Sequence, residues 1–120
     1  MLTFYQGQIG KHQIILVRCG VCKVNAAIAA QALIDRFQVD LLINSGTAGG
    51  IDPSVQLFGT VVSEKIAYHD VAPHILTQYH PFMESVYFSA DPRLLALMRQ
   101  CAPQLPNTLR FGTTVTGEQF

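Results

Sequence analysis

The sequence predicts an α/β protein with a mixed, mostly parallel sheet flanked by helices. Three observations support this prediction. Strand-like segments alternate with helical ones, residues 39–44 form a nearly continuous apolar run, and a cluster of small residues follows that run directly. Such alternation favours parallel strands, because each crossover connection is long enough to form a helix that packs on the sheet. An apolar run without polar alternation is typical of a strand that is covered on both faces.

The first half of the chain is predicted to contain a hairpin and a helix before this buried strand. Residues 3–9 and 12–18 are strand-like, and Gly10-Lys11 joins them as a tight turn. A helix is expected from Lys23 to about Phe37, because small and apolar residues recur on one face. The residues on that face are Ala26, Ala29, Ala30, Leu33 and Phe37.

The second half begins with a turn, two further strands and a long loop. Asp52-Pro53 marks the turn, residues 59–68 form a strand, and residues 86–89 form a short one. Residues 69–84 contain two prolines and three histidines without a clear period, so we expect a loop there.

The last part of the chain is predicted to be a helix followed by a strand. The helix is expected to start at Asp91-Pro92, because this pair is typical of an N-cap followed by a first helical residue. Pro103 ends the helix, and residues 108–116 form the last strand. A Thr-Gly turn comes next, at a place where α/β folds usually carry ligand-binding residues.

Composition and charge exclude several classes of function. Residues 1–120 are expected to form a single domain with a modest core. Eight basic and eight acidic residues cancel, which argues against nucleic acid or an anionic membrane as a partner. No apolar stretch is long enough to span a membrane, and we expect no leader. Three cysteines, an odd number, favour a reducing cytoplasm over a disulfide framework.

Two groups of metal-ligating residue types are better explained structurally. Cys19 and Cys22 have the spacing of a redox dithiol, but no second ligand pair occurs at a suitable distance in the sequence. His69, His74 and His80 lie in a proline-containing loop at spacings that match no helical ligand pair. We therefore expect incidental thiols, histidines that bind backbone groups or line an interface, no metal and no cofactor.

The small residues from Ser45 to Gly50 form the most informative turn. The segment SGTAGG lacks the lysine of a Walker loop and does not match GxGxxG. It is either a plain tight turn or a cradle that binds an anion or a sugar through backbone N–H groups and the Thr47 hydroxyl. Small residues remove side-chain bulk and permit unusual dihedral angles, so a ligand close to the backbone is one expectation.

A second turn strengthens the expectation of a ligand site. Gly20-Val21 and residues 46–50 each follow a predicted buried strand, so both are expected at the carboxyl edge of one sheet, where open α/β folds bind ligands. Phe120 is expected to reach the same edge from a third strand. There its ring either stacks on a planar base or packs in the core.

Three blocks of sequence together resemble the purine nucleoside phosphorylase superfamily. They are RCGVCKVNAA at residues 18–27, NSGTAGGI with the following VVSE and YHD within residues 44–70, and TTVTGEQF at residues 113–120. Within this superfamily the chain most resembles the methylthioadenosine/S-adenosylhomocysteine nucleosidases. The resemblance covers most of the chain, least in residues 71–106, and implies a partial phosphorylase/hydrolase-like fold.

The resemblance also implies a reaction and a set of binding residues. The family cleaves the N-glycosidic bond of purine nucleosides through an oxocarbenium-like sugar. Val21 would contact the ribose or the base. Thr47, Ala48 and Gly49 would lie near the sugar and the attacking water. Phe120 would stack on the purine.

Further positions bear on the partner subunit and on the nucleophile. By resemblance, Pro73 and Leu76 would help to form the partner's pocket in a homodimer. Hexameric phosphorylases carry an arginine where Asn44 stands here, and a phosphate dianion favours a fixed guanidinium. Asn44 therefore favours hydrolysis, and Arg18 is the alternative source of positive charge if its side chain points inward.

The family's catalytic carboxylates are not expected in this chain. The resemblance implies a glutamate before the first strand, and a Met-Glu pair and an aspartate after the last one. Asp52, Glu64, Asp70 and Glu118 match none of these roles. We therefore expect the middle part of a nucleosidase, inactive by itself and prone to self-association. The alternatives are a purine nucleoside phosphorylase and a non-catalytic nucleoside-binding or interaction domain.

Overall fold

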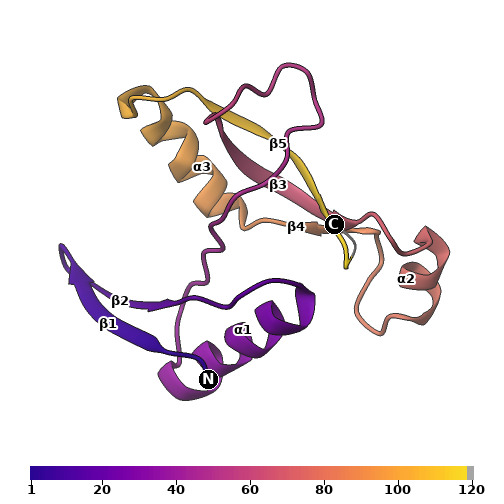
Figure 1. The fold of residues 1–120 in the computed structure, drawn as a ribbon, viewed down its shortest axis with the longest axis horizontal. Helices are drawn as coiled ribbons and strands as arrows, with labels where there is room; N and C mark the ends of the chain where they lie inside the picture. Colours follow the sequence, from indigo (N-terminus) through magenta and orange to yellow (C-terminus); the bar gives the residue numbers. More distant parts are fainter. Residues whose placement is uncertain (119–120) are drawn as a thin grey trace. The chain divides into compact units, whose positions relative to one another are not determined.

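A computed structural model describes residues 1–118 of the chain. It divides into two compact units, Met1–Thr47 and Ala48–Phe120 (Figure 1). Each unit has its own sheet among the described residues, two-stranded in the first unit and three-stranded in the second. Helices flank these sheets, so the predicted α/β class with a mixed sheet is confirmed.

The first unit opens with the predicted hairpin. Strands β1 (Phe4–Ile9) and β2 (His12–Val17) pair antiparallel, with Ile9 opposite His12. Gly10 in the connecting turn has φ +59°, a left-handed value that favours glycine because a β-carbon there meets the backbone. This two-residue turn matches the twist of the strands and sets their register.

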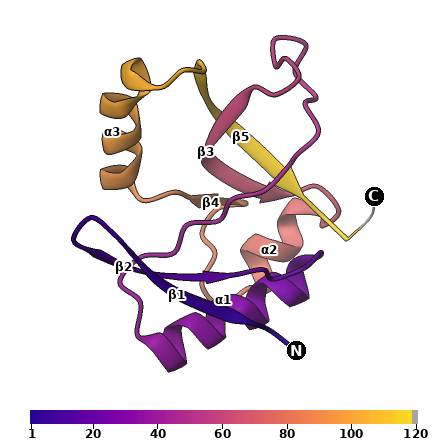
Figure 2. The same ribbon diagram turned by 60° about the vertical axis from the view of Figure 1, so that its left-hand side comes forward.

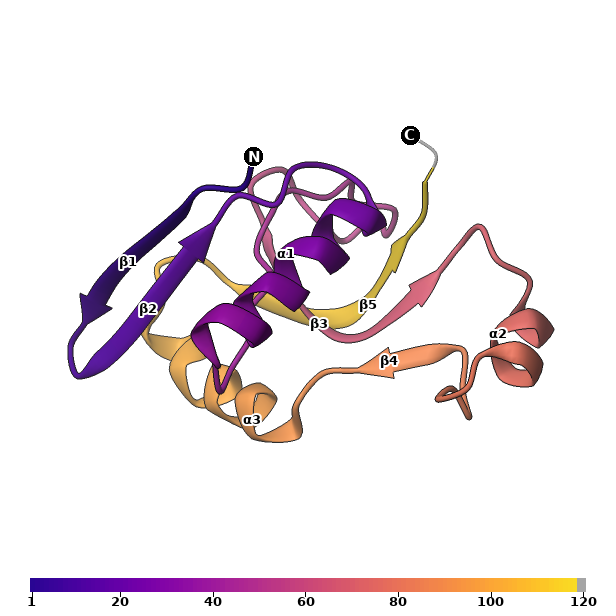
Figure 3. The ribbon, with the colours of Figure 1, turned by 90° about the horizontal axis from the view of Figure 1, so that it is seen from below.

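Helix α1 (Lys23–Phe37) has the predicted bounds and lies beside the hairpin (Figure 3). The ring of Phe37 packs against the ring of Phe4 in β1, with centroids 5.1 Å apart. The helix ends at Gln38, which is left-handed and whose backbone N–H donates to the Ile34 carbonyl at 3.0 Å. That bond satisfies one of the carbonyls that a helix end leaves unpaired.

The sheet of the second unit is mixed, with the strand order β4-β3-β5 (Figures 1 and 2). Strand β3 (Thr60–Tyr68) pairs antiparallel with β4 (Tyr87–Ser89) and parallel with β5 (Leu109–Thr116). All three strands were predicted. The register places Tyr68 opposite Thr116, so β3 and β5 end together at the carboxyl edge of the sheet.

Helix α3 (Pro92–Cys101) is capped by the residue before it and is attached to the sheet through Arg99. The Asp91 side chain accepts a hydrogen bond from the backbone N–H of Arg93 at 2.7 Å, which confirms the predicted N-cap. Arg99 forms an ion pair with Glu64 of β3, and its guanidinium lies 4.6 Å from the ring centroid of Phe111 in β5. These contacts hold α3 against the sheet, and a short 3-10 turn, η1 (Ala102–Gln104), follows it.

Two predictions about elements are wrong. Residues 69–84, expected to be a loop, contain helix α2 (Pro73–Tyr79). Pro73 lies in the first turn of this helix, where its missing N–H leaves no bond unmade, so the proline starts the helix instead of breaking it. Residues 39–44, expected to be a buried strand, form no strand and are mostly exposed. An apolar run becomes a strand only where a neighbouring strand pairs with its backbone groups.

The expectation that two turns share the edge of one sheet is also wrong. Strand β2, which precedes Gly20-Val21, pairs with β1 in a sheet of its own. The turn at residues 45–50 follows no strand. Among the predicted substrate-binding segments in the described part of the chain, only residues 117–118 follow a strand of the three-stranded sheet.

The core of the described chain is sparse. The buried hydrophobic residues there are Ala29, Ala67, Leu76 and Met83. Large apolar side chains are exposed instead, including Leu57 at 90% and Phe58 at 95%. Within residues 1–118, no helix combines the length and the apolar character that a membrane crossing requires.

Candidate functional site

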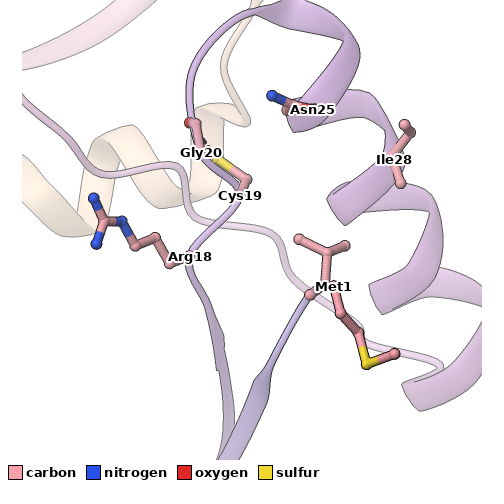
Figure 4. A pocket seen from close by; sticks show the side chains of 7 residues that line it. Met1, Arg18, Cys19, Gly20, Asn25 and Ile28 are labelled. Atoms are coloured by element: carbon pink, nitrogen blue, oxygen red, sulfur yellow. Dashed lines mark hydrogen bonds between the residues drawn. The ribbon is translucent and has the colours of Figure 1, made fainter.

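The turn between β2 and α1 borders a hollow of about 540 Å³ in the first unit (Figure 4). Gly20 has φ +83° and Cys22 has φ +75°, so both residues that flank Val21 adopt positive φ values. The lining residues are Met1, Leu2, Arg18, Cys19, Gly20, Asn25 and Ile28. The predicted ligand turn at Gly20-Val21 therefore borders an open concavity, with the Val21 side chain 59% exposed.

Asn25 is a residue of this turn that sequence reasoning missed. Its side-chain Nδ2 donates to the carbonyl oxygen of Val21 at 2.6 Å and so joins the first turn of α1 to the residue before its N-cap. This hydrogen bond fixes the backbone of the residue that was predicted to contact a ligand. The available signal was an asparagine at the start of a predicted helix, because such a side chain can hydrogen-bond nearby backbone groups.

Arg18 does not direct its charge into the hollow. Figure 4 shows its guanidinium turned away from Asn25 and Ile28, although Arg18 is one of the residues that line the hollow. Arg18 was expected to bind an anion only if its side chain pointed inward. In this structure the side chain does not point inward.

The small-residue turn at 45–50 is open rather than tightly folded. A β-carbon at Gly46 or Gly49 would meet no atom within 4 Å, whereas one at Gly50 would lie 3.1 Å from the Val55 side chain. None of the three has a positive φ, so the expectation of unusual dihedral angles is wrong there. Nothing within the described chain requires glycine at positions 46 and 49.

The other predicted binding residues are placed as follows. Thr47 is the last residue of the first unit, and Ala48 begins the second; both are exposed, as is Gly49. Pro73 is exposed at the start of α2, and Leu76 of the same helix is only 7% exposed. Phe120 lies outside the described residues.

The described chain does show an unpredicted arrangement at the ends of β3 and β5. The residues concerned are His69, Asp70, Gly117 and Glu118, here called the carboxyl-end cluster. The backbone N–H of Glu118 donates to Oδ2 of Asp70 at 2.7 Å, so the ends of β3 and β5 are connected. A carboxylate just after one strand and a glycine just after its parallel neighbour were the only signals in the sequence.

The other local carboxylates also have structural partners. The backbone N–H of Ser54 donates to Oδ1 of Asp52 at 2.8 Å. Hydrogen bonds from the Ser54 side chain and backbone lower the pKa of Asp52. Glu64 forms the ion pair with Arg99, at a point where the pairing of β3 with β5 is irregular. These carboxylates thus stabilise a turn and the attachment of a helix.

The histidines and cysteines show structural interactions. As predicted for a loop histidine, Nδ1 of His80 accepts a hydrogen bond from the backbone N–H of Phe82 at 3.2 Å. The Sγ of Cys19 donates to the carbonyl of Gly20 at 3.4 Å. Over residues 1–118, no three of the His, Cys, Asp and Glu side chains come together in a way that would hold a metal ion.

Comparison with known sequences relates nearly the whole chain to one family. A sequence model of the family described as "Phosphorylase superfamily" matches residues 2–120. The 5'-methylthioadenosine/S-adenosylhomocysteine nucleosidase of Tolumonas auensis is 37% identical over 121 aligned residues, which cover 98% of this chain and 52% of that protein. The chain spans about half the length of the curated relatives it matches.

Solved structures show the same relationship. A nucleosidase of this kind from S. pneumoniae, with the transition-state inhibitor MT-ImmA, gives a TM-score of 0.86 at 33% identity and covers 99% of this chain and 53% of that one. One from Colwellia psychrerythraea in complex with adenine gives 0.82 at 36% identity, covering 99% and 51%. The fold of residues 1–118 therefore matches about half of each of those chains.

Proposed function

Because the chain belongs to the phosphorylase superfamily, we propose that it is part of a nucleosidase that releases adenine from methylthioadenosine or S-adenosylhomocysteine. The reaction is hydrolysis of the N-glycosidic bond. The observation that carries the proposal is the 37% identity to the T. auensis nucleosidase across 98% of the chain. The adenine and the inhibitor in the two solved relatives support a purine nucleoside as the substrate. Residues 1–120 then belong to a single domain.

The small-residue turn is the proposed cradle for the ribose and the attacking water. The hydroxyl of Thr47 and the backbone of Ala48 and Gly49 supply the polar groups, and the open space at Gly49 supports this role. Val21 contacts the ribose or the base beside the hollow, with its backbone held by Asn25. Phe120 stacks on the purine.

The chemistry requires more groups than this cradle supplies. Cleavage passes through an oxocarbenium-like sugar, so the leaving base must be protonated and a water activated. We place none of these steps on Asp52, Glu64, Asp70 or Glu118. The first three have side chains engaged in the contacts described above, and Glu118 lies in the turn that Asp70 holds. Residues 1–120 by themselves are therefore expected to be inactive.

Hydrolysis is preferred over phosphorolysis because residues 1–118 show no fixed guanidinium at the proposed cradle. Asn44 occupies the position where the resemblance places an arginine in phosphorylases, and Arg18 is turned away from the hollow (Figure 4). A dianionic phosphate in a pocket needs a charge of this kind.

The proposed assembly is a homodimer in the cytoplasm. Pro73 is exposed at the start of α2 and is available to a partner subunit, and Leu76 on the same helix supports that surface from inside its own unit. The odd number of cysteines favours a reducing compartment.

The test is adenine release from methylthioadenosine by the protein that contains residues 1–120, assayed with and without phosphate. Release that does not depend on phosphate supports the nucleosidase. Release that requires phosphate and yields a sugar phosphate indicates a phosphorylase. Nucleoside binding without cleavage indicates a binding domain. The same assay on residues 1–120 alone, folded as judged by melting, tests whether the catalytic groups lie elsewhere.

A further inference from the structure

Strands β3 and β5 leave the sheet side by side (Figure 1). Their parallel register ends with Tyr68 opposite Thr116, and the backbone N–H of His69 donates to the Thr116 carbonyl at 3.0 Å, which extends the pairing by one residue. The residues that follow each strand therefore start from neighbouring points. In open α/β folds this carboxyl edge is where ligands bind.

Gly117 lies close to two side chains, which a β-carbon at this position would displace. Its φ is not in the positive range that favours glycine. A β-carbon at this position would lie 2.4 Å from Nε2 and 2.6 Å from Cε1 of His69. It would also lie 2.8 Å from Oδ2 of Asp70. The imidazole and the carboxylate thus both lie directly against the backbone of Gly117.

Asp70 fixes the next residue of the same segment. Its Oδ2 accepts the backbone N–H of Glu118 at 2.7 Å, across 48 residues of sequence. A hydrogen bond to an ionised acceptor is stronger than one between neutral groups. The capping bond of Asp91 has the same length but joins residues only two apart, so it shapes one turn. The Asp70 bond instead holds two distant segments together.

From this arrangement we propose that His69 and Asp70 are positioning residues for nucleoside binding. They act through Gly117 and Glu118, which follow β5 at the carboxyl edge of the sheet, the edge where open α/β folds bind ligands. The inference rests on the proposed function. It assigns neither residue a chemical step. A displacement of about 1 Å in a positioning segment is enough to weaken catalysis about a hundredfold.

The test compares variants that differ in one contact. Asp70→Ala removes the acceptor, Asp70→Asn keeps an oxygen that can accept the same N–H, and Gly117→Ala adds the β-carbon. Asp91→Ala is the matched control, because it also removes a carboxylate bonded to a backbone N–H at 2.7 Å. Gly112→Ala is the control for glycine, because a β-carbon there meets no atom within 4 Å.

Two measurements on the protein that contains residues 1–120 test separately the Asp70 contact and its effect on nucleoside binding. Hydrogen exchange at the Glu118 amide measures the contact without any ligand, and we expect it to accelerate at least about tenfold in Asp70→Ala but not in Asp91→Ala. Methylthioadenosine kinetics measure the consequence. We expect KM to rise about tenfold in Asp70→Ala and Gly117→Ala, with kcat changing less and Asp70→Asn recovering most of the loss.

The outcomes distinguish this inference from the proposed function. Accelerated exchange together with an unchanged KM would overturn the positioning role while leaving the nucleosidase intact. Unchanged exchange in Asp70→Ala would overturn the contact itself. If the unsubstituted protein neither binds nor cleaves methylthioadenosine, the proposed function fails, and the positioning role for nucleosides fails with it whatever the exchange data show.

Discussion

Cys22, the residue before α1, has φ +75° and ψ 158°, a conformation that only glycine adopts readily. For a residue with a β-carbon it costs about 1–3 kcal/mol. No side-chain hydrogen bond of Cys22 caps the helix in return. Such strain recurs at binding sites, and here it adjoins Val21 and the hollow.

Replacing Cys22 by glycine is therefore expected to stabilise the protein. Relief of the strain exceeds the roughly 0.5–1 kcal/mol of extra chain entropy that glycine loses on folding, so the net gain is about 1 kcal/mol. Thermal melting would show this as a rise in Tm of several degrees. Cys22→Ala is the control, because it keeps a β-carbon and with it the strain. An equal gain in both variants would mean that the thiol, not the backbone, is the source.

The hydroxyl of Thr47 is expected to matter for catalysis. Thr47→Val keeps the shape of the side chain but removes its hydrogen-bonding group, and kcat/KM for methylthioadenosine should fall about tenfold, as for the loss of one hydrogen bond. The control is Thr113→Val on β5, an exposed threonine that has no proposed role. Equal activity of both variants would remove Thr47 from the proposed cradle.

At the scale of elements, the start of α3 is an example of a local sequence signal that predicts the structure correctly. Asp91 is followed by Pro92, and the structure contains both the N-cap bond and the first-turn proline that this pair predicts. Arg93 also forms an ion pair with Asp91, with Nη2 and Oδ2 2.7 Å apart. The hydrogen bond and ion pair with Arg93 lower the pKa of Asp91 to about 2.

This shift predicts how the start of α3 responds to acid. The folded state favours the ionised carboxylate. Its contribution to the free energy of unfolding is therefore complete above the ordinary pKa of 3.8 and is lost as the pH falls through about 2. Titration of the Asp91 carboxyl carbon by NMR should show a midpoint near the lower value. In Arg93→Ala the midpoint should move up toward the ordinary value. A midpoint that Arg93→Ala leaves unchanged would contradict the assignment.

Elements that depend on distant partners were harder to predict. The hairpin, α1, α3 and β5 follow from turn residues, caps and periodicity within each segment. The apolar residues 39–44 have the composition of a strand, but no neighbouring strand pairs with them in the described chain. The carboxyl-end cluster was missed for a related reason, since it depends on the register that brings Asp70 beside Glu118. No sequence pattern within either segment predicts that register.

At the scale of the whole molecule, the exposed apolar side chains predict association. Phe58 and Phe82 are 95% and 87% exposed, and no large side chain in the described chain is fully buried. Exposed apolar surface of this kind favours contact with another protein surface.

Residues 1–120 in isolation are therefore expected to self-associate. Light scattering coupled to size-exclusion chromatography should give a mass that rises with protein concentration. At the same concentration, the Phe82→Ser variant should give a lower mass. A monodisperse monomer at all concentrations would show that the exposed residues are compatible with an isolated chain. The surface substitution Lys11→Ser is the control, since it alters a polar turn.

The parallel pairing of β3 with β5 has a consequence for how the chain acquires its structure. The hairpin of β1 and β2 closes over a two-residue turn, whereas α2, β4 and α3 all separate β3 from β5 in the sequence. Contacts between distant segments form late, because their loop-closure entropy is lost before the pairing stabilises them. During synthesis β3 can pair with β4 before β5 has been made, and the other edge of β3 then stays unpaired for a time. Nascent chains are then most exposed to wrong partners in that interval, and a chaperone that shields this edge would raise the yield.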